Sequence, residues 1–481
     1  MKERFQISKY LQIIQRTDNN FALYHSLYGG LCIVDKNIKE VLKSFQTPKS
    51  EQEALIINKD FNAKQINSFI QIFRSKNFLV KQNIDEYSEL NRRIQNIDKQ
   101  LNSGCQIGVV QLVLSNLCNF KCEYCFINHI YSSKERLMSQ KSSKNKMMST
   151  KQAQIYLEQT IKLIKKNGNK SLSVQFFGGE PLINWKTMKF VLTHFSDGEK
   201  YGIKIHYSIV TNGSLINDEI AEYCKIYNVA VIVSFDSPRG KDRMLNNGKS
   251  SYKKIIHGLG ILNKYKNRII FNSVLSDETF EYFDTDLIDF ALQYKVFEIG
   301  VLLDLNPKFY KNYKTKDIVN KLWKVYLYGK QKGVILTGYW HMVFQQITRH
   351  KLFEARNFKT CSGTGAQLSI EPSGDVFACK GSSGYFGNIL DIEKLLSSKN
   401  YRKYALRSFL NPPDCRACEI ENFCSGFCLG PLEKKYGDIY VVEKNTCNTY
   451  KEITKRLIKD IKINDIETYN MPKENISYSS L

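Results

Sequence analysis

Short β-forming runs and amphipathic helical stretches alternate between residues 107 and 332, and this alternation restricts the fold more than any other feature of the sequence. Strands that alternate with helices form parallel sheets, because each helix carries the chain back to the starting edge of the sheet. The sequence therefore predicts an α/β fold with six βα units. The predicted strands span 107–115, 171–177, 203–210, 229–235, 268–275 and 296–303, and the predicted helices include 150–166, 215–227 and 315–332.

Each of the first four predicted strands is followed by a loop of unusual composition. A loop with three cysteines comes first, and "GGEP" (178–181), "TNGS" (211–214) and "SFDS" (234–237) belong to the next three strands. The carboxyl ends of parallel strands lie at one edge of a sheet, where functional groups collect. We therefore expect these four loops to meet at one mouth.

The regions on either side differ from this core. Near the amino terminus, "FALYHSL" and "GLCIVDK" flank a Tyr-Gly-Gly turn as hairpin strands would, helical patterns follow at 37–46 and 63–75, and the apolar run "FLV" predicts a wing. After residue 345, glycine and cysteine replace the regular alternation. We expect a small winged-helix-like α+β module (1–100), an α/β core (105–345), a cysteine-rich domain (346–450) and a polar tail that begins as a helix and frays (451–481).

The 481-residue chain contains 13 cysteines, and the expected cellular compartment makes that number informative. The first residues, "MKERFQISKY", lack the apolar core of a secretory signal, and no run approaches eighteen consecutive apolar residues. We therefore expect a cytoplasmic protein that does not enter a membrane. Because a reducing compartment keeps thiols free, metal or redox chemistry is the leading explanation for these cysteines.

The chain is strongly basic, with 70 Lys and Arg against 47 Asp and Glu and a formal net charge of +23. The positive charges are spread along the chain, and their densest run is at 132–146. Such a composition is typical of a solvated lysine-rich surface, and it also favours attraction to an acidic peptide or to nucleic acid. Charge alone does not separate these interpretations.

The loop after the first predicted strand contains Cys118, Cys122 and Cys125 in a C-x3-C-x2-C spacing. A structural zinc site needs four protein ligands, so three thiols leave it incomplete. An iron–sulfur cube has four irons, so three thiolates hold three of them and leave one iron open to a ligand from outside the protein.

This spacing resembles the signature of the radical S-adenosylmethionine (radical SAM) superfamily, and the other strand-end loops resemble that family's motifs in the expected order. The resemblance implies a partial (β/α)6 barrel in which S-adenosylmethionine chelates the open iron of a 4Fe-4S cluster. It also implies that one electron cleaves S-adenosylmethionine, and that the resulting 5′-deoxyadenosyl radical takes a hydrogen atom from the substrate. The protein would bind, orient and shield, while the cofactor carries the chemistry.

The same resemblance assigns the contacts to S-adenosylmethionine. Gly178 and Gly179 would let the backbone approach its methionine end, and Glu180 would accept from its ammonium group. Arg243 is the candidate for the carboxylate-binding arginine, and Arg239 competes for that role because the preceding loop is shorter than is usual in the family. The remaining contacts would be Tyr124 on the adenine and Ser234 and Asp236 on the ribose.

A second cysteine set occupies the last third of the chain. Four of its members, from 415 to 428, follow a C-x2-C-x5-C-x3-C spacing, which taken alone would suit one zinc ion. That alternative leaves the other three without a role. The full set is Cys361, Cys379, Cys415, Cys418, Cys424, Cys428 and Cys447.

The full pattern resembles the SPASM extension that follows many radical SAM barrels, which implies two auxiliary 4Fe-4S clusters and three clusters in all. Cys361, Cys379 and Cys428 would hold the inner auxiliary cluster. This cluster is one thiolate short, so that a substrate or a distant group completes it, or one iron stays open. Because these loops have little apolar content, cluster binding should stabilise the region directly. The outer auxiliary cluster would be held by Cys415, Cys418, Cys424 and Cys447.

The amino-terminal module resembles the RiPP recognition element, which binds a leader peptide by adding it as a strand to a sheet edge. With the SPASM resemblance, this implies an enzyme that installs a crosslink or another oxidative change in a ribosomally made precursor peptide. The tether would raise the local concentration of the peptide, and the basic surface would suit an acidic leader. The alternative is that the module is a structural cap on the barrel. The implied electron source is an external donor such as flavodoxin or ferredoxin.

Two other functions remain as alternatives. Anaerobic sulfatase maturases place an aspartate after the cysteine that corresponds to Cys379, whereas this chain has Lys380. A nucleic-acid modifying radical SAM enzyme is suggested by the charge, but the sequence lacks a paired aromatic and basic RNA-binding motif, so we expect no nucleic-acid partner. Cys32, Cys105 and Cys224 belong to neither set, and we expect them to be small buried hydrophobic side chains.

Overall fold

The computed structural model describes residues 3–122, 124–125, 146–196, 199–239, 243–348, 359, 361–424, 426 and 428–461. The basic run at 132–145 and the tail beyond residue 461 therefore lie outside the described residues. None of the described helices is long and apolar enough to cross a membrane.

Six parallel strands form the centre of the molecule, and they follow one another in chain order. Val, Ile, Leu and Phe dominate most of these strands, and β6 and β9 are buried along almost their whole length, as is typical of parallel sheets covered by helices. In β8 only alternate residues, Tyr207, Ile209 and Thr211, are buried. The prediction of an α/β fold with six βα units is confirmed, and the barrel is partial. The strands are β6 (Val109–Ser115), β7 (Ser171–Gly178), β8 (Lys204–Thr211), β9 (Ala230–Ser234), β10 (Ile269–Leu275) and β11 (Glu298–Leu303).

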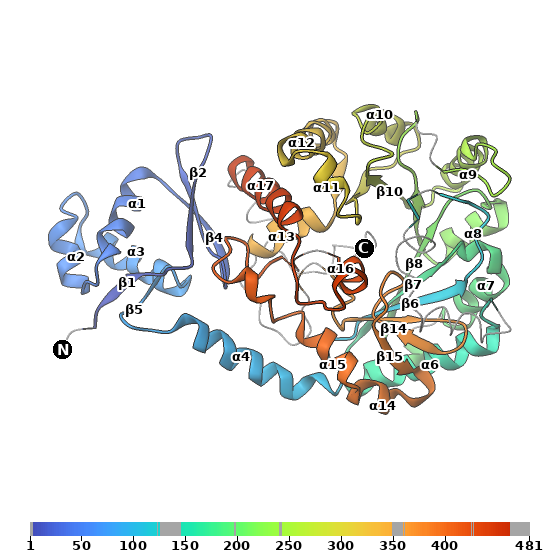
Figure 1. Ribbon diagram of the computed structural model, residues 1–481, viewed down its shortest axis with the longest axis horizontal. Helices are drawn as coiled ribbons and strands as arrows, with labels where there is room; N and C mark the ends of the chain where they lie inside the picture. Colours follow the sequence, from blue (N-terminus) through green and yellow to red (C-terminus); the bar gives the residue numbers. More distant parts are fainter. Residues whose placement is uncertain are drawn as a thin grey trace.

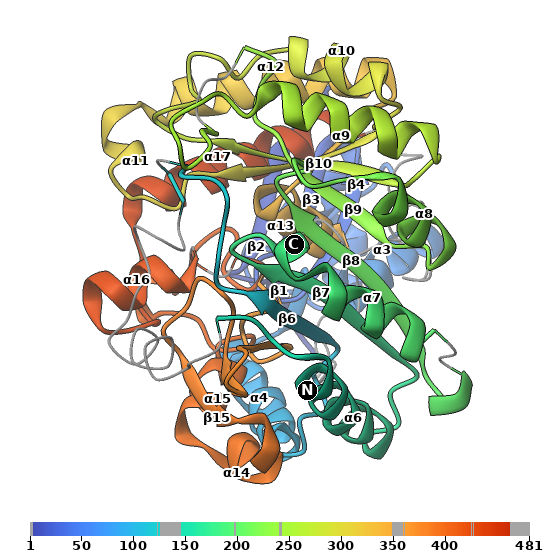
Figure 2. The same ribbon diagram turned by 90° about the vertical axis from the view of Figure 1, so that its right-hand side faces the viewer.

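The sheet continues beyond both ends of this series. Strand β12 (Ile335–Thr337) pairs in parallel with β11 at one end. At the other end, β13 (Gln367–Ile370) pairs in parallel with β6, with Gln367 opposite Val109. Strands β14 (Asp375–Phe377) and β15 (Tyr385–Asn388) extend it antiparallel. The cysteine-rich region is therefore built onto the free edge of the first barrel strand (Figure 2), a pairing that the sequence analysis did not predict.

The crossover helices lie around the outside of the sheet (Figure 2). Helix α6 begins at a capping box formed by Ser149 and Gln152, and α12 ends at Gly333, whose φ of 75° suits glycine. Both helices have the predicted bounds. The set comprises α6 (Thr150–Lys166), α7 (Trp185–His194), α8 (Asp218–Ile226), α9 (Tyr252–Lys264), α10 (Asp286–Gln293) and α12 (Thr315–Lys332).

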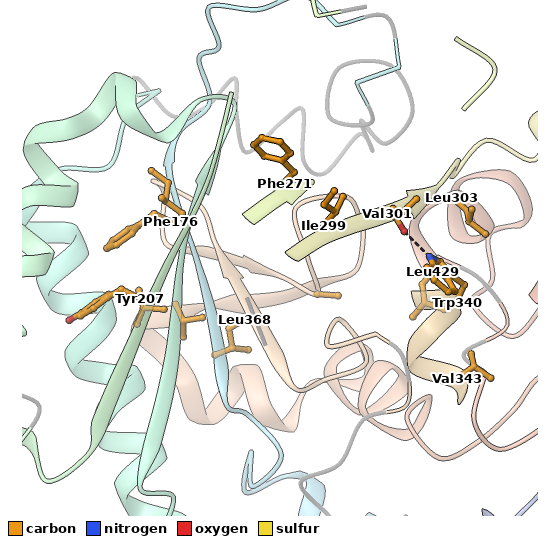
Figure 3. Packing of buried hydrophobic residues seen from close by; sticks show 14 of the residues in the cluster. Phe176, Tyr207, Phe271, Ile299, Val301, Leu303, Trp340, Val343, Leu368 and Leu429 are labelled. Carbon is orange, nitrogen blue, oxygen red and sulfur yellow. Dashed lines mark hydrogen bonds between the residues drawn. The ribbon is translucent and has the colours of Figure 1, made fainter. Parts of the chain in front are cut away.

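The main core joins the barrel to the carboxyl-terminal region (Figure 3). Trp340 at the start of α13 (Tyr339–Thr348) donates its indole N–H to the carbonyl of Val301, at 3.1 Å. Gly338 precedes it, and a Cβ there would lie 2.3 Å from that same carbonyl oxygen. Only glycine therefore allows α13 to start against β11. The core also includes Phe176, Tyr207, Phe271, Ile299, Leu303, Val343, Leu368 and Leu429.

The amino-terminal module has the predicted order of a hairpin, helices and a wing. An antiparallel sheet is followed by three helices, and the wing β5 (Leu79–Lys81) pairs with the first strand, β1 (Phe5–Ile7). The sheet consists of β2 (Leu11–Gln15), β3 (Phe21–His25) and β4 (Gly29–Val34), and the helices are α1 (Lys36–Lys43), α2 (Glu51–Ile57) and α3 (Ala63–Ser75).

This small sheet has two buried faces. Leu23 and Val34 belong to a separate core shared with the module's own helices, whereas Tyr24 and Leu31 belong to the main core. Helix α4 (Glu86–Leu101) leads from the module to the barrel along the lower side of the molecule in Figure 1, and its apolar face also joins the main core. The module is thus docked firmly on the rest of the chain.

The remaining helices surround the second cysteine set. Helix α17 lies beside α12 (Figure 1), where Arg456 donates to Asn320 Oδ1 at 2.8 Å. It begins earlier than the helix predicted for the tail. These helices are α11 (Phe309–Asn312), α14 (Ile392–Ser397), α15 (Lys399–Leu406), α16 (Leu429–Tyr436) and α17 (Lys444–Asp460).

Candidate active site

One cavity of about 280 Å³ lies at the carboxyl ends of the barrel strands, and it is lined by parts of both cysteine sets. Loops after β6, β7, β8 and β9 contribute to its wall, as the sequence predicted. The wall also includes α13 and the turn after β14, which come from outside the predicted loops. Cys118, Cys122, Cys125, Cys361, Cys379 and Cys428 all face this one space.

The first cysteine loop is held in place by hydrogen bonds to its neighbours. Asn246 donates to the Cys118 carbonyl at 2.8 Å, and Asn119 donates to Ser214 Oγ at 2.9 Å. Burial raises the pKa of the Cys118 thiol to about 11. Because only the thiolate binds iron, cluster loading at this loop must release protons.

The two glycines of "GGEP" pack directly against this loop. A Cβ on Gly179 would lie 2.4 Å from the Leu117 carbonyl oxygen, and the same oxygen accepts a hydrogen bond from Glu180 N at 2.8 Å. Gly178 has a φ of 154°, and a Cβ there would lie 2.2 Å from the Ser115 carbonyl oxygen. The glycines therefore fix the distance between the cysteine loop and the turn after β7.

Glu180 is buried beneath the turn that it follows. Its carboxylate accepts from Thr211 Oγ1 at 2.7 Å, from Asn212 N at 2.8 Å and from Leu182 N at 3.1 Å. Burial raises the pKa of Glu180 to about 7, against the effect of these donors. A cationic ligand in the cavity would favour its ionised form.

Three other residues that were predicted to contact S-adenosylmethionine, Tyr124, Asp236 and Arg243, are hydrogen-bonded to one another. Asp236 accepts from Arg243 Nε at 2.8 Å and from Arg243 Nη2 at 3.2 Å, and the hydroxyl of Tyr124 donates to the same carboxylate. Val274 N completes the set at 2.9 Å. Ser234, at the end of β9, also lines the cavity. In this arrangement Asp236 orients Arg243 and Tyr124 at the cavity wall.

The structure separates the two candidate arginines. Arg243 lines the cavity, with a side chain that is 15% exposed. Arg239 lies on the surface, where its Nε is 2.6 Å from Asp286 Oδ2. Geometry therefore favours Arg243 for a contact inside the cavity.

The structure brings together the three cysteines that the sequence analysis grouped as the inner set. Burial raises the pKa of the Cys428 thiol, and the nearby Cys379 and Cys361 raise it further. Tyr339, at the start of α13, lies beside all three, and its pKa is raised first by burial and then by these thiols. The sequence analysis missed Tyr339, and no motif pointed to it.

The outer set converges on another point. Burial raises the pKa of the Cys447 thiol to about 12, and Cys415 and Cys418 add to this effect. Ala417, with a φ of 64°, turns the chain between those two cysteines, and its N–H donates to Glu421 Oε2 at 2.9 Å. Cys424 is the fourth member: burial raises the pKa of its thiol, and the charge of Cys447 raises it further.

These donor sets suit iron–sulfur clusters. In the described residues, no three His, Cys, Asp or Glu side chains converge as ligands of a single ion would. A cube is consistent with this, because it binds each thiolate to a different iron. A zinc site on residues 415–428 would also need Cys428, which faces the inner set instead. The buried Lys359, bonded to Asn411 and to the Phe409 carbonyl, lies near Cys415 and Cys424, whose thiolates would balance its charge.

The three cysteines outside these sets differ in burial. Cys224 is buried on α8 and 1% exposed, as predicted. Cys32 and Cys105 are only half-buried, and the Cys105 thiol donates to the Gln100 carbonyl at 3.5 Å. The expectation of full burial is therefore wrong for these two: Cys32 packs against the module's own core but stays partly exposed, and Cys105 lies in the turn after α4.

Asp304, which the sequence analysis also missed, follows β11 and lines the cavity. Its Oδ1 accepts from Asn306 N at 2.8 Å, and no described Lys, Arg or His lies within ion-pair distance of it. Burial raises the pKa of Asp304 to about 7, and the neighbouring Glu278 and Asp277 contribute. The pKa of Glu180 is raised to a similar value, but three hydrogen-bond donors already occupy its carboxylate. Asp304 is therefore the cavity carboxylate better placed to give or take a proton near neutral pH.

Comparisons with protein families agree with this geometry. Residues 112–289 match the model of the Radical SAM superfamily, and residues 361–419 match that of an iron–sulfur cluster-binding domain called SPASM. The chain is 49% identical to the radical SAM cyclopropyl synthase TigE of Paramaledivibacter caminithermalis over 94% of this chain and 95% of that protein. It is 26% identical to a cysteine-type anaerobic sulfatase-maturating enzyme of Clostridium novyi over 67% of this chain and 87% of that enzyme.

Two solved structures share the fold. Streptococcus suis SuiB bound to its precursor peptide SuiA has a TM-score of 0.52 and 18% identity, covering 92% of this chain and 99% of SuiB. The enzyme anSMEcpe with bound AdoMet has a TM-score of 0.59 and 21% identity, covering 75% of this chain and 99% of that enzyme. The SuiB likeness extends over more of this chain.

Proposed function

Because this chain belongs to the radical SAM superfamily and carries a SPASM extension, we propose that it abstracts a hydrogen atom from a ribosomally made precursor peptide and installs a crosslink or another oxidative change. The chain is an enzyme that binds S-adenosylmethionine and iron–sulfur clusters. The observation that carries the proposal is the single cavity shared by the first cysteine loop and the inner auxiliary set. A substrate held there would contact both.

We assign three clusters to the three groups of cysteines. Cys118, Cys122 and Cys125 would hold the cluster that binds S-adenosylmethionine. The inner auxiliary cluster would be held by Cys361, Cys379 and Cys428, and the outer one by Cys415, Cys418, Cys424 and Cys447. Bound S-adenosylmethionine, cleaved by one electron, would supply the 5′-deoxyadenosyl radical.

The residues of the chain would bind and orient this cofactor. Glu180 would accept from its ammonium group, which offsets the cost of keeping a buried carboxylate ionised. Arg243, already oriented by Asp236, would meet its carboxylate, with Gly178 and Gly179 allowing close approach. Ser234 and Asp236 would contact the ribose and Tyr124 the adenine. Apolar side chains of Val210, Ile232 and Val274 line the cavity between these groups and would exclude water.

Oxidation of the substrate also needs a proton acceptor, and Asp304 is suited to this role. One hydrogen of the peptide would leave as an atom to the 5′-deoxyadenosyl radical. The second would leave as a proton to Asp304, while one electron passes to an auxiliary cluster. Loss of the hydrogen atom, together with loss of the proton and the electron, is a two-electron oxidation that would form one new bond in the peptide.

The amino-terminal module would bind the leader of the precursor. Arg16 N donates to the Asn20 carbonyl and Ser26 N to the Tyr10 carbonyl, each at 2.9 Å. Hydrogen bonds therefore alternate along β2 so that the N–H of Ile13 points away from β3. Ile13 is also 41% exposed. A leader strand can add at this edge, and Ile13→Pro would remove one of its donors without breaking the β2–β3 ladder.

The sulfatase-maturase alternative is less well supported. The sequence likeness to those enzymes is weaker than to TigE. At the position where they carry an aspartate, Lys380 forms a buried ion pair with Glu371. The nucleic-acid alternative rests on charge alone.

Co-expression tests the proposal. Each short open reading frame encoded beside the gene would be expressed anaerobically with the enzyme, and the peptide masses would be compared. We expect the mass of one peptide to fall by the mass of the hydrogen atoms that it loses, and only when it is co-expressed with the wild-type enzyme. Cys118→Ala should abolish both S-adenosylmethionine cleavage and the mass loss, whereas Cys428→Ala should keep some cleavage and lose the modification. Unchanged peptides with an enzyme that cleaves S-adenosylmethionine would contradict the peptide assignment.

A further inference from the structure

A groove of about 650 Å³ runs between the start of α12 and the length of α17, separate from the active-site cavity. Two contacts hold these helices side by side: Arg456 with Asn320 at 2.8 Å, and Lys330 with Asp460 at 3.2 Å. The groove is lined by Lys316, Glu419, Asn448, Lys451, Lys455 and Arg456.

The groove carries excess positive charge. Glu452 also lines it, and this carboxylate is paired with Arg456 at 3.1 Å. Lys316, Lys451 and Lys455 form no ion pair with any carboxylate in the part of the chain that the structure describes. Lys316 and Lys455 are exposed. The surface therefore attracts an acidic partner.

Two of the residues that line the groove are next in the chain to cysteines of the outer set. Glu419 follows Cys418 in the chain, and Asn448 follows Cys447. Lys451 stands one helical turn after Cys447 and therefore on the same side of α17. A molecule in the groove would be within a residue or two of two outer-set cysteines.

The two auxiliary sets differ in their access to the surface. The residues next to Cys415 are Asp414 and Arg416, and both are exposed. The residues next to Cys379, Ala378 and Lys380, are buried. The inner set therefore lies among buried residues at the cavity, while the chain around Cys415 of the outer set reaches the surface.

We propose that this basic groove is the docking site of an acidic one-electron carrier protein, which delivers electrons to the cluster at Cys415, Cys418, Cys424 and Cys447. The inference rests on the proposed function for the presence of that cluster. One electron would leave the reduced cofactor of the carrier, which is oxidised, and would pass through the outer cluster to the cluster at Cys118, Cys122 and Cys125, where S-adenosylmethionine cleavage consumes it. The outer cluster would be left oxidised, so that an auxiliary cluster can still take up the electron that the peptide loses. No bond forms or breaks in the transfer itself. Electron-transfer contacts are small and are formed by electrostatic steering, which this charged groove suits.

The test compares two reductants on the reconstituted full-length enzyme, with no peptide present. The initial rate of 5′-deoxyadenosine formation is measured with reduced bacterial flavodoxin and with dithionite, which needs no docking site. The variant is Lys451→Glu/Lys455→Glu. The control is Lys253→Glu/Lys254→Glu, which reverses two exposed lysines on α9, away from the groove. Flavodoxin binding is measured in parallel by biolayer interferometry at two salt concentrations, and iron content is measured for every protein.

We expect the groove variant to lose about tenfold or more in kcat/KM for flavodoxin at low salt. Its dithionite rate and iron content should stay within about twofold of the wild type, and its flavodoxin binding should weaken in parallel. The α9 control should behave as the wild type with both reductants. Lys451→Arg/Lys455→Arg should retain the flavodoxin rate.

Two results would overturn the inference. One is an unchanged flavodoxin rate in the groove variant; if that variant has also lost binding to single-stranded RNA, measured by the same interferometry, the groove belongs to nucleic acid. The other is an equal fall with both reductants, which would place the effect on the clusters. A wild type that cleaves no S-adenosylmethionine with dithionite would instead refute the proposed function, and the docking inference with it.

Discussion

Lys380 and Glu371 form an ion pair that is almost completely closed to solvent, with Lys380 Nζ 3.0 Å from Glu371 Oε1 and side chains 1% and 2% exposed. The Lys380 backbone N–H also donates to Gln111 Oε1 at 2.9 Å, so the residue after Cys379 is tied to the first barrel strand. This position therefore holds the turn after β14 against β6. It is not available as a catalytic base.

Lys380→Met should destabilise the protein by about 3–5 kcal/mol, because it leaves the Glu371 carboxylate buried without its partner. Unfolding of the anaerobic holoenzyme in urea, followed by tryptophan fluorescence, measures the change. The double variant Lys380→Met/Glu371→Met removes both charges and should recover most of the loss. If the single and double variants were equally unstable, lost packing rather than an unpaired charge would be the cause.

Gly179→Ala should abolish S-adenosylmethionine cleavage, because the new Cβ would lie 2.4 Å from the Leu117 carbonyl and displace the cysteine loop. Iron content should fall by about four per chain, since the cube that we propose for this loop would be lost. Gly260→Ala on α9 is the matched control: a Cβ there meets nothing within 4 Å. The control should keep full activity and gain up to about 1 kcal/mol from helix propensity.

The fold of the barrel could be predicted from the sequence because its signals are local. The strands of Val, Ile and Phe, the capping box of Ser149, and Gly333 after α12 are read within a few residues of where they act. The pairing of β13 with β6 could not be predicted, since Gln367 and its partner Val109 are about 258 residues apart in the chain. Nothing in the sequence around Gln367 indicates Val109 as its neighbour.

The same difference applies to the active site. Its cysteines and the "GGEP" turn have fixed spacings, whereas Asp304, Tyr339 and Glu371 are single residues without a motif. Their roles come from burial and from neighbours that only the folded chain brings together. For Cys105 the prediction failed in the opposite way. Its residue type predicted a buried side chain, but its position after α4 leaves it only half-buried.

Asp304→Asn should separate cleavage from modification. S-adenosylmethionine should still be cleaved, while peptide modification falls by about 10² to 10⁴, the usual effect of losing an acid–base group. In the wild type, modification should rise with pH through about 7, since the base form of Asp304 is needed. Asp277→Asn/Glu278→Gln removes two neighbouring charges and should move this rise to lower pH. A modification rate that is flat between pH 6 and 8, with unchanged cleavage, would exclude the role.

Asp304 should also lower the stability of the folded protein at neutral pH. The pKa of Asp304 is raised from the ordinary 3.8 to about 7 in the folded chain, so the unfolded state binds fewer protons between these values. The loss in free energy of unfolding that Asp304 causes is therefore greatest above pH 7 and disappears as the pH falls towards 4. Asp304→Asn should stabilise the protein by up to roughly 4 kcal/mol at pH 8, and by little at pH 4. Urea unfolding at the two pH values measures the difference.

Removal of residues 1–100 should destabilise the cysteine-rich region as well as weaken peptide binding. Tyr24 donates to the Glu419 carbonyl at 3.1 Å, and Asn422 N donates to the Ser26 carbonyl at 3.1 Å, so the module supports the chain between Cys418 and Cys424. Iron content of the truncated protein should fall. Ile13→Pro, by contrast, should keep iron content and cleavage and lower only the affinity for the precursor, measured by a pull-down.

The most direct test of the account is the content of iron, acid-labile sulfide and zinc per chain after anaerobic reconstitution. Three cubes on the three cysteine groups predict about twelve irons with matching sulfide and no stoichiometric zinc. About four irons together with one zinc would contradict the account: the radical SAM cluster would remain, but the auxiliary set would be a structural zinc site with no means of accepting an electron.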